Sequence, residues 1–233
     1  MSKGPSEPIS SGQDMRMYFV GRDKEIGRMK EALKAGNNII VLGKYGMGRT
    51  SLVQHLAKTT QDRWRFVFVD FSQTPGNVCK HLMAELFPTQ EFVREHARYR
   101  SSRFRITTLA LNDSRKHVLV LDNVSKLSRQ SLDLIRYLTW ERRFQFVSIV
   151  ESFLSSNDLF LLRVRMAPST LITLRRLSAP SVVLFFEQLS REHHLDWTEG
   201  QIKDLAEITG GYPLRIKEIA LRELAGRQRY GGE

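Results

Sequence analysis

The sequence predicts an α/β fold: a parallel, five-stranded sheet covered by helices on both faces and followed by a small three-helix lid. Three observations support this fold. Strand-like apolar runs alternate with helical patterns between residues 22 and 174. A glycine-rich loop joins the first strand to the helix that follows it. After residue 177 only helical patterns remain, so the sheet is expected to end there.

The α/β core is expected to span residues 18–177. Residues 1–17 are expected to form a disordered leader, because the first 14 are rich in Ser, Gly and Pro. A first helix at 22–35 places Ile26, Met29 and Leu33 on one face, with charges opposite. The apolar runs predict strands at 38–42, 65–71, 117–121, 144–150 and 171–174, and the patterns between them predict helices at 51–57, 78–87, 128–138 and 157–162.

The lid is expected at residues 178–226, with 227–233 as a tail. Ser178 and Pro180 are typical of a helix start. Thr198 and Gln201 have the spacing of a capping box, which predicts the start of a second helix. The Gly210–Gly211 pair ends that helix, and a third helix begins at the proline two residues later.

Charge is the most unusual feature of the composition. The chain has 36 Lys and Arg against 25 Asp and Glu, a formal net charge of +11. Such a surplus favours polyanionic partners, nucleic acid before a membrane surface, although a merely soluble basic protein fits as well. The single cysteine, Cys79, excludes an internal disulfide and indicates a reducing cytoplasm. The sequence has no signal-peptide pattern and no apolar run long enough to span a bilayer.

The loop Gly43–Thr50 matches a phosphate-binding loop except at one position. The general pattern is Gly, four residues, Gly, Lys, then Ser or Thr, and here Arg49 stands in place of the lysine. Backbone N–H groups of such a loop surround phosphate oxygens, and the helix N-terminus adds partial positive charge. Arginine keeps the charge but is larger, planar and forked. The predicted phosphate-binding residues are Gly43, Lys44, Tyr45, Gly46, Met47, Gly48, Arg49, Thr50 and Ser51.

A magnesium site is expected where the loop meets the third strand. Thr50 offers a hydroxyl, and Asp122 ends an apolar strand where proteins with this loop place the Mg²⁺-associated carboxylate. The next residue, Asn123, orients a water molecule but cannot accept its proton, and general-base catalysis is worth about 10²–10⁴ in rate. Glu151 or Asp70, at the ends of neighbouring strands, is a weaker candidate for a displaced catalytic carboxylate.

Over residues 18–226 the chain resembles the AAA+ ATPases. Residues 18–26 resemble the segment that lies beside adenine in that superfamily, residues 43–50 its Walker A motif, residues 119–123 its Walker B motif, and residues 209–215 its lid motif. The resemblance implies ATP with Mg²⁺ as ligands. It implies adenine and lid contacts from Val20, Gly21, Arg22, Pro213 and Arg215.

The resemblance also suggests catalytic roles, with departures from the pattern. Asn123 replaces the usual Walker B glutamate, and Arg49 replaces the Walker A lysine, so ATP hydrolysis is expected to be weak or absent. Arg163 and Arg165 precede the fifth strand, where such proteins place an arginine finger that reaches a neighbouring subunit. Ser152 falls near the position of a polar residue called sensor 1, with a poor match.

Within the superfamily, residues 171–178 and the short lid look closest to bacterial transposition target-selection and secretion ATPases. This implies an ATP-dependent oligomer on double-stranded DNA that acts with a recombinase or replication factor. Signal-transducing (STAND) ATPases share the motif at 19–26 and the lid motif, so an interaction module that binds nucleotide but not DNA is the alternative. Two further possibilities stay open: a competent ATPase in which Arg49 suffices, and a partition-type ATPase in which Lys44 is the signature lysine.

One basic segment is a candidate DNA contact. Aromatic residues separate its arginines, which suit sequence-independent binding to phosphates. On a helix these arginines scatter around the axis, so an ordinary solvated surface explains them as well. The candidates are Arg94, Arg98, Arg100, Arg103 and Arg105.

Overall fold

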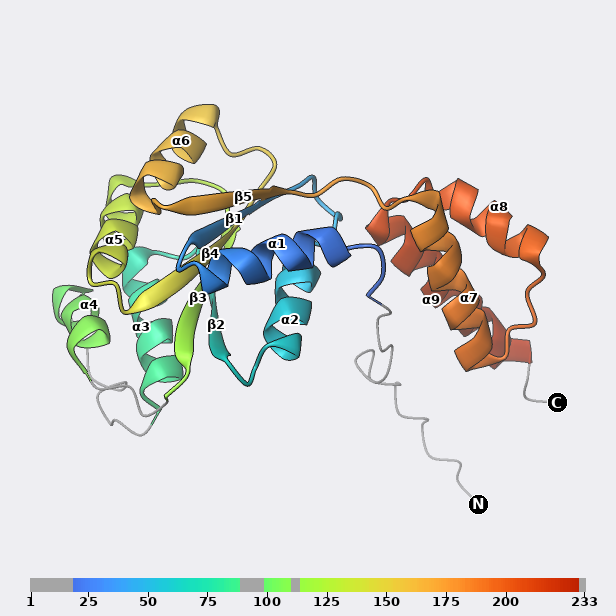
Figure 1. The fold of residues 1–233 in the computed structure, drawn as a ribbon, viewed down its shortest axis with the longest axis horizontal. Coiled ribbons are helices and arrows are strands. Elements are labelled where there is room, and N and C mark those ends of the chain that lie inside the picture. The colour runs from blue at the N-terminus through green and yellow to red at the C-terminus, as the bar shows by residue number, and fades with distance from the viewer. Residues whose placement is uncertain (1–18, 89–98, 110–113, 231–233) are drawn as a thin grey trace, which may run out of the picture.

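The computed structural model describes residues 19–88, 99–109 and 114–230, with side chains described as far as residue 225. The expected leader at 1–17 and the candidate DNA contacts Arg94 and Arg98 lie outside these residues. Figure 1 shows an α/β core with a helical lid at one end.

Five parallel strands form a single sheet in the order β2–β3–β4–β1–β5 (Figure 1). The predicted five-stranded parallel sheet is therefore confirmed. The central strands are almost wholly buried because helices cover both faces, and their sequences are accordingly continuous apolar runs. The strands are β1 (Asn38–Leu42), β2 (Trp64–Asp70), β3 (Lys116–Val124), β4 (Phe144–Val150) and β5 (Ser169–Thr173).

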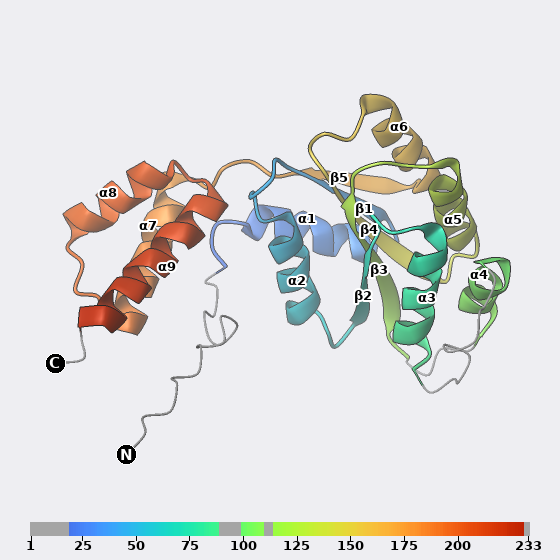
Figure 2. The same cartoon turned by 180° about the vertical axis from the view of Figure 1, so that it is seen from behind.

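Helices cover both faces of the sheet (Figures 1 and 2). Two apolar clusters, one on each face, hold these helices in place. One cluster joins the sheet to α1 (Asp23–Lys34) and α2 (Arg49–Thr59). The other joins it to helices of the opposite layer, where Thr74, Ser128 and Ser155 cap α3, α5 and α6 through their side-chain oxygens. That layer comprises α3 (Pro75–Leu86), α4 (Tyr99–Thr108), α5 (Arg129–Trp140) and α6 (Ser156–Arg165).

The lid has its own apolar core. Its helices are α7 (Ala179–His193), α8 (Glu199–Thr209) and α9 (Pro213–Tyr230), and they pack around residues such as Phe186. The predicted capping box at Thr198 and Gln201 is present at the start of α8. Among the described residues, every helix is too short or too polar to span a membrane.

Buried Arg22 joins the lid connection to the core. Its guanidinium donates hydrogen bonds to the backbone oxygens of Met47, in the phosphate-binding loop, and Arg175, at 3.3 and 2.8 Å, and to Glu25 at 3.1 Å. Since Arg175 lies between β5 and α7, one side chain fixes the loop, the first helix and the connection to the lid.

The third strand departs from its expected end. We predicted that Asp122 would follow the strand, but β3 continues to Val124. The pairing with β4 shifts between Leu121 and Val124, and Asn123 has a φ of +59°. Asparagine tolerates this left-handed conformation better than most residues, which gives a backbone reason for its presence at this position.

Candidate nucleotide-binding site

The phosphate-binding loop connects β1 to α2, as predicted. Its glycines Gly46 and Gly48 have φ values of +76° and +79°, which other residues rarely adopt. Helix α2 begins at Arg49, directly after the loop, so its first backbone N–H groups face the loop. This backbone provides the expected setting for a phosphate group.

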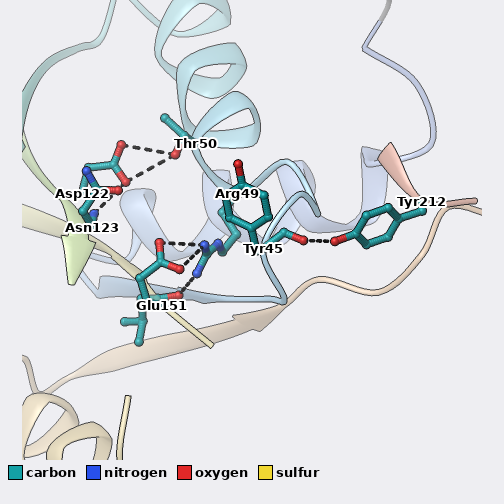
Figure 3. Close-up of polar contacts among 8 residues, drawn as sticks. Tyr45, Arg49, Thr50, Asp122, Asn123, Glu151 and Tyr212 are labelled. Atoms are coloured by element: carbon teal, nitrogen blue, oxygen red, sulfur yellow. Dashed lines mark hydrogen bonds and ion pairs between the residues drawn. The ribbon is translucent and has the colours of Figure 1, made fainter. Parts of the chain in front are cut away.

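Thr50 and Asp122 lie together beside the loop (Figure 3). The Thr50 hydroxyl is 3.3 and 3.2 Å from the two carboxylate oxygens of Asp122. Burial raises the pKa of Asp122, because the charged form loses water contacts. A hydroxyl and a partly desolvated carboxylate are oxygen ligands of the kind that Mg²⁺ prefers, so these two residues fit the metal that the fold implies.

Arg49 is bound by a carboxylate of its own chain. Its Nη2 donates to both carboxylate oxygens of Glu151, at 2.8 and 2.7 Å, and its Nη1 donates to the backbone oxygen of Val150 (Figure 3). The side chains of Arg49 and Glu151 are 7% and 17% exposed. The arginine that replaces the loop lysine is therefore half of a largely buried ion pair, in which one nitrogen donates to both carboxylate oxygens.

The amide of Asn123 is used within the protein. Its Nδ2 donates to Asp70, 3.3 Å away, and its backbone N–H donates to Asp122 at 2.8 Å. Hydrogen bonds from Ser72, with smaller contributions from Gln73 and Asn123, lower the pKa of Asp70. Asn123 thus connects Asp70, at the end of β2, with Asp122, its paired residue on β3.

A cavity of about 260 Å³ lies between the loop and the lid. Most of its lining is apolar, as suits a planar base, and Lys217 is the cation from the lid at its wall. Of the residues that the family resemblance assigned to adenine and lid contacts, Val20, Arg22 and Pro213 line the cavity. Arg215 is exposed and does not line it. The wall of the cavity also includes Phe19, Met47, Leu177, Phe185, Leu214 and Ile216.

The start of α9 rests directly on the phosphate-binding loop. The Leu214 N–H donates to the Gly46 backbone oxygen at 3.1 Å, and the Tyr212 hydroxyl donates to the Tyr45 backbone oxygen (Figure 3). A methyl group added to Gly46 would lie 2.8 Å from the Leu214 Cβ. The lid is therefore in contact with the loop at a position that only glycine allows.

None of the contacts described above involves the remaining predicted residues. Arg163 and Arg165 are in the last turn of α6. Lys44 and Ser152 are exposed. On α4, Arg100 is exposed and Arg105 half-buried, whereas the Arg103 guanidinium packs 4.2 Å from the centre of the Tyr137 ring.

Sequence reasoning missed the two contacts that shape the site most. Glu151 was considered as a displaced catalytic carboxylate, but it is the partner of Arg49. A glutamate at the end of the strand beside β1 was the available signal, since parallel strands bring their carboxyl ends together. No sequence signal identified Tyr212 and Leu214 as contacts of the loop.

Comparisons with known proteins place these features in a family. A family model for the AAA ATPase domain matches residues 18–150, more than half of the chain. A search of curated proteins found no match.

Solved structures share the fold at low sequence identity. The Orc1 protein of Aeropyrum pernix, in complex with DNA, has a TM-score of 0.66 and 16% identity over 91% of this chain and 62% of that chain. The RuvB Holliday junction branch migration motor of Thermotoga maritima has a TM-score of 0.56 and 15% identity, over 88% of this chain and 62% of that chain. A STAND protein of Pyrococcus horikoshii with a tetratricopeptide repeat sensor has a TM-score of 0.54 and 19% identity, over 85% of this chain and 29% of that chain.

The chain spans less than two thirds of the length of each of these structures. Their likeness shows the fold, whereas the family follows from the domain match together with the phosphate-binding loop, the Thr50–Asp122 pair and the lid. The chain therefore belongs to the AAA ATPase domain family.

Proposed function

We propose that this protein binds ATP with Mg²⁺ and hydrolyses it weakly or not at all, acting as an oligomeric, DNA-associated adaptor or regulator. The observation that carries the proposal is the Arg49–Glu151 ion pair. The residue that stands at the position of the loop lysine is held by a carboxylate, so the pair as a whole adds no net charge to the phosphate site.

Binding has sufficient support without Arg49. The loop offers backbone N–H groups at the start of α2, and the cavity beside it offers an apolar wall. Thr50 and Asp122 would hold Mg²⁺, which supplies positive charge against the phosphates when bound. These groups contact the nucleotide in its ground state, and contacts of that kind give affinity whether or not hydrolysis follows.

Turnover lacks two contributions. An arginine shared with Glu151 offers less charge to stabilise the phosphoryl transition state than a lysine directed at the phosphates. Asn123 has an amide in the position of the usual Walker B glutamate, and an amide does not accept a proton from water. Asp70, whose lowered pKa keeps it ionised, is bound by Ser72 and Asn123.

Association with DNA is supported by charge and by the related structures. The formal net charge is +11, and one structural relative is an Orc1 protein in complex with DNA. The adaptor role requires a partner protein such as a recombinase or replication factor, and self-association in which Arg163 or Arg165 reaches a neighbour's nucleotide. The buried single cysteine, Cys79, suits the reducing cytoplasm.

The test measures ATP binding and ATP hydrolysis separately on the intact chain, each with and without duplex DNA. We expect Mg²⁺-dependent ATP binding, turnover far below that of an active ATPase, and duplex binding that strengthens with ATP. Robust Mg²⁺-dependent hydrolysis by the native chain would overturn the claim of weak turnover. ATP binding without any duplex binding would instead favour the alternative function.

The alternative is a protein-interaction module of the STAND type that uses nucleotide to set its shape. The match to the Pyrococcus horikoshii STAND protein favours it, as does the direct contact between the lid and the loop. In that case nucleotide would change the protection of the lid helices from hydrogen exchange, and DNA would have no effect.

A further inference from the structure

A second cavity lies at the other end of the parallel strands. It has a volume of about 620 Å³, and its lining includes the residues at which β1, β3 and β4 begin. The phosphate-binding loop follows the carboxyl end of β1, so the two cavities lie at opposite ends of the sheet. We call this second cavity the basic groove.

Cations line the rim of the basic groove. Arg115, Lys116 and Arg142 are exposed, and Arg143 is half-buried. Among the described residues that line the groove there is no Asp or Glu. Four cations that line one concavity give it a positive potential, which favours an anionic ligand.

The floor of the groove is rigid and formed in advance. The buried Asn38 donates from Nδ2 to the Met166 backbone oxygen at 2.8 Å and accepts from the Phe146 N–H at 2.9 Å. Gln145 donates to the Leu33 backbone oxygen at 3.1 Å. These contacts fix the amino ends of β1 and β4, so a ligand meets a shaped surface and little ordering is required on binding.

Two of the arginines are oriented by backbone groups. Arg115 donates to the Gln61 backbone oxygen at 2.9 Å. Arg143 donates to Leu109 at 2.7 Å and also to Thr107, at the carboxyl end of α4. The second contact makes the groove continuous with α4, the helix that carries the exposed Arg100.

We propose that the basic groove binds the phosphodiester backbone of duplex DNA, without reading its sequence. This inference rests on the DNA association in the proposed function and assigns it a site. The cations lie at the rim, where an extended polyanion crossing the groove contacts several of them, whereas a small enclosed anion requires buried donors. Figure 1 shows α4 and the lid at opposite ends of the molecule, so DNA at the groove leaves the nucleotide cavity open.

The test compares two triple variants of the full chain by fluorescence anisotropy with labelled duplex DNA across a salt series. The groove variant is Arg115→Gln, Lys116→Gln and Arg142→Gln. The control variant is Lys58→Gln, Arg191→Gln and Lys203→Gln, which removes the same charge from exposed positions on α2 and the lid.

Each phosphate contact contributes about one unit to the slope of log K against log salt, so the groove variant should lose about three units. We expect its affinity at low salt to fall about tenfold or more, while the control stays near wild type. ATP binding and the unfolding temperature verify that each variant folds. Because Arg115 also contacts Gln61, the double variant Lys116→Gln and Arg142→Gln is measured too, and it should lose about two units.

The possible failures are distinguishable. If wild-type protein binds no duplex, the DNA association in the proposed function fails, and the groove assignment fails with it. If wild-type binds and the folded groove variants keep its affinity and slope, only the groove assignment is wrong. Loss of binding equal to that of the control variant would show a general charge effect and also overturn the assignment. If inorganic tripolyphosphate binds the wild-type protein, does not bind the groove variant and leaves duplex DNA bound to the wild type, the groove is a site for small anions and the assignment to DNA is wrong.

Discussion

At the scale of single residues, the proposed weak hydrolysis depends most on Arg49, because its guanidinium has two possible partners. Glu151 holds it with two hydrogen bonds, and phosphate oxygens would compete for the same N–H groups. Breaking the largely buried pair by removing one partner costs about 3–5 kcal/mol, so phosphate must supply much of that energy to recruit Arg49. We therefore expect Arg49 to add less to ATP affinity than a loop cation that has no carboxylate partner.

The substitution Arg49→Lys should raise affinity for ATP, turnover, or both. Lysine has a single nitrogen and cannot bind Glu151 and the Val150 backbone oxygen through two separate nitrogens as Arg49 does, so more of its charge is available to phosphate. One charged hydrogen bond gained is worth about 1.5–3 kcal/mol, or roughly tenfold or more in affinity. Titration calorimetry and a turnover assay measure the two effects. Arg49→Gln is the control without charge and should gain neither. Unchanged affinity and turnover in the lysine variant would mean that the loop is vestigial.

Asp122 is expected to lower the stability of the ligand-free fold at neutral pH and to contribute a ligand for Mg²⁺. Its pKa is raised by burial, so the folded state holds a proton more tightly than the unfolded state does. Stability from this group is present below the unfolded pKa, about 3.9, and is lost as the pH rises through the raised folded pKa. At pH 7 the ionised Asp122 is consequently a cost to the ligand-free fold.

The substitution Asp122→Asn should therefore stabilise the ligand-free protein at pH 7 while removing the Mg²⁺-dependent part of ATP binding. We expect the unfolding temperature to rise at pH 7, and the rise to shrink toward pH 4. Calorimetry at both pH values tests this, with Asp133→Asn on the outer face of α5 as a control carboxylate. A destabilised variant, or one that keeps its Mg²⁺ dependence, would contradict the assignment of Asp122.

At the scale of elements, the lid and the phosphate-binding loop form one unit. Tyr212 and Leu214, at the start of α9, bind backbone oxygens of Tyr45 and Gly46. A ligand in the adjoining cavity touches both elements, since Met47 and Ile216 line opposite sides of it. Movement of the lid and occupancy of the loop are therefore coupled through contacts shared by both.

Two glycines of the loop allow this coupling to be tested with a matched pair. Gly46→Ala and Gly48→Ala both place alanine at a φ near +80°, which costs about 1–2 kcal/mol in each case. Only the Gly46 variant also meets the lid, at the Leu214 Cβ, because nothing lies within 4 Å of a methyl group at Gly48. The clash should add about 1–3 kcal/mol of destabilisation.

Denaturant unfolding measures the difference between the two variants, and hydrogen exchange of the Leu214 amide reports contact between the lid and the loop. We expect faster exchange in the Gly46 variant than in the Gly48 variant. Equal stability and equal exchange would show that the lid does not rest on Gly46 in solution.

Much of this element scale was predictable, and the exceptions have physical causes. All five strands and the lid helices follow from apolar runs, caps and breakers, which act locally along the chain. The extension of β3 through Asn123 was not predicted, because it depends on a shift in pairing with β4. The Arg49–Glu151 pair joins residues about a hundred positions apart, and only the order of the strands brings them together.

At the scale of the whole molecule, basic side chains and exposed apolar side chains gather on different surfaces. Figure 2 shows α4 at the end of the molecule away from the lid. The basic groove is lined by residues at the amino ends of β1, β3 and β4. Helix α6 has exposed apolar side chains on the sheet layer opposite α1 and α2, with Phe160 62% and Val164 53% exposed, one turn apart. The exposed Arg163 lies beside Val164 in the sequence. These two exposed apolar side chains, one turn apart, make α6 a candidate for contact with another protein.

Self-association should therefore depend on α6 if the protein works as an oligomer. We expect sedimentation velocity to show larger species with ATP and Mg²⁺, and the double variant Phe160→Ser and Val164→Ser to weaken them. Each buried side chain of this kind contributes about 1.5–3 kcal/mol, so the assembly constant should fall by at least about tenfold. Ile208→Ser, which replaces an apolar residue of α8 that is 63% exposed, is the matched control on the lid.

Arg163→Ala should reduce assembly with ATP more than without it, because an arginine that reaches a neighbour's nucleotide has a partner only when that nucleotide is bound. Assembly that survives the α6 variants but is lost in the Ile208 variant would place the contact between subunits on the lid, and a chain that stays monomeric with ATP would leave α6 for a different protein partner.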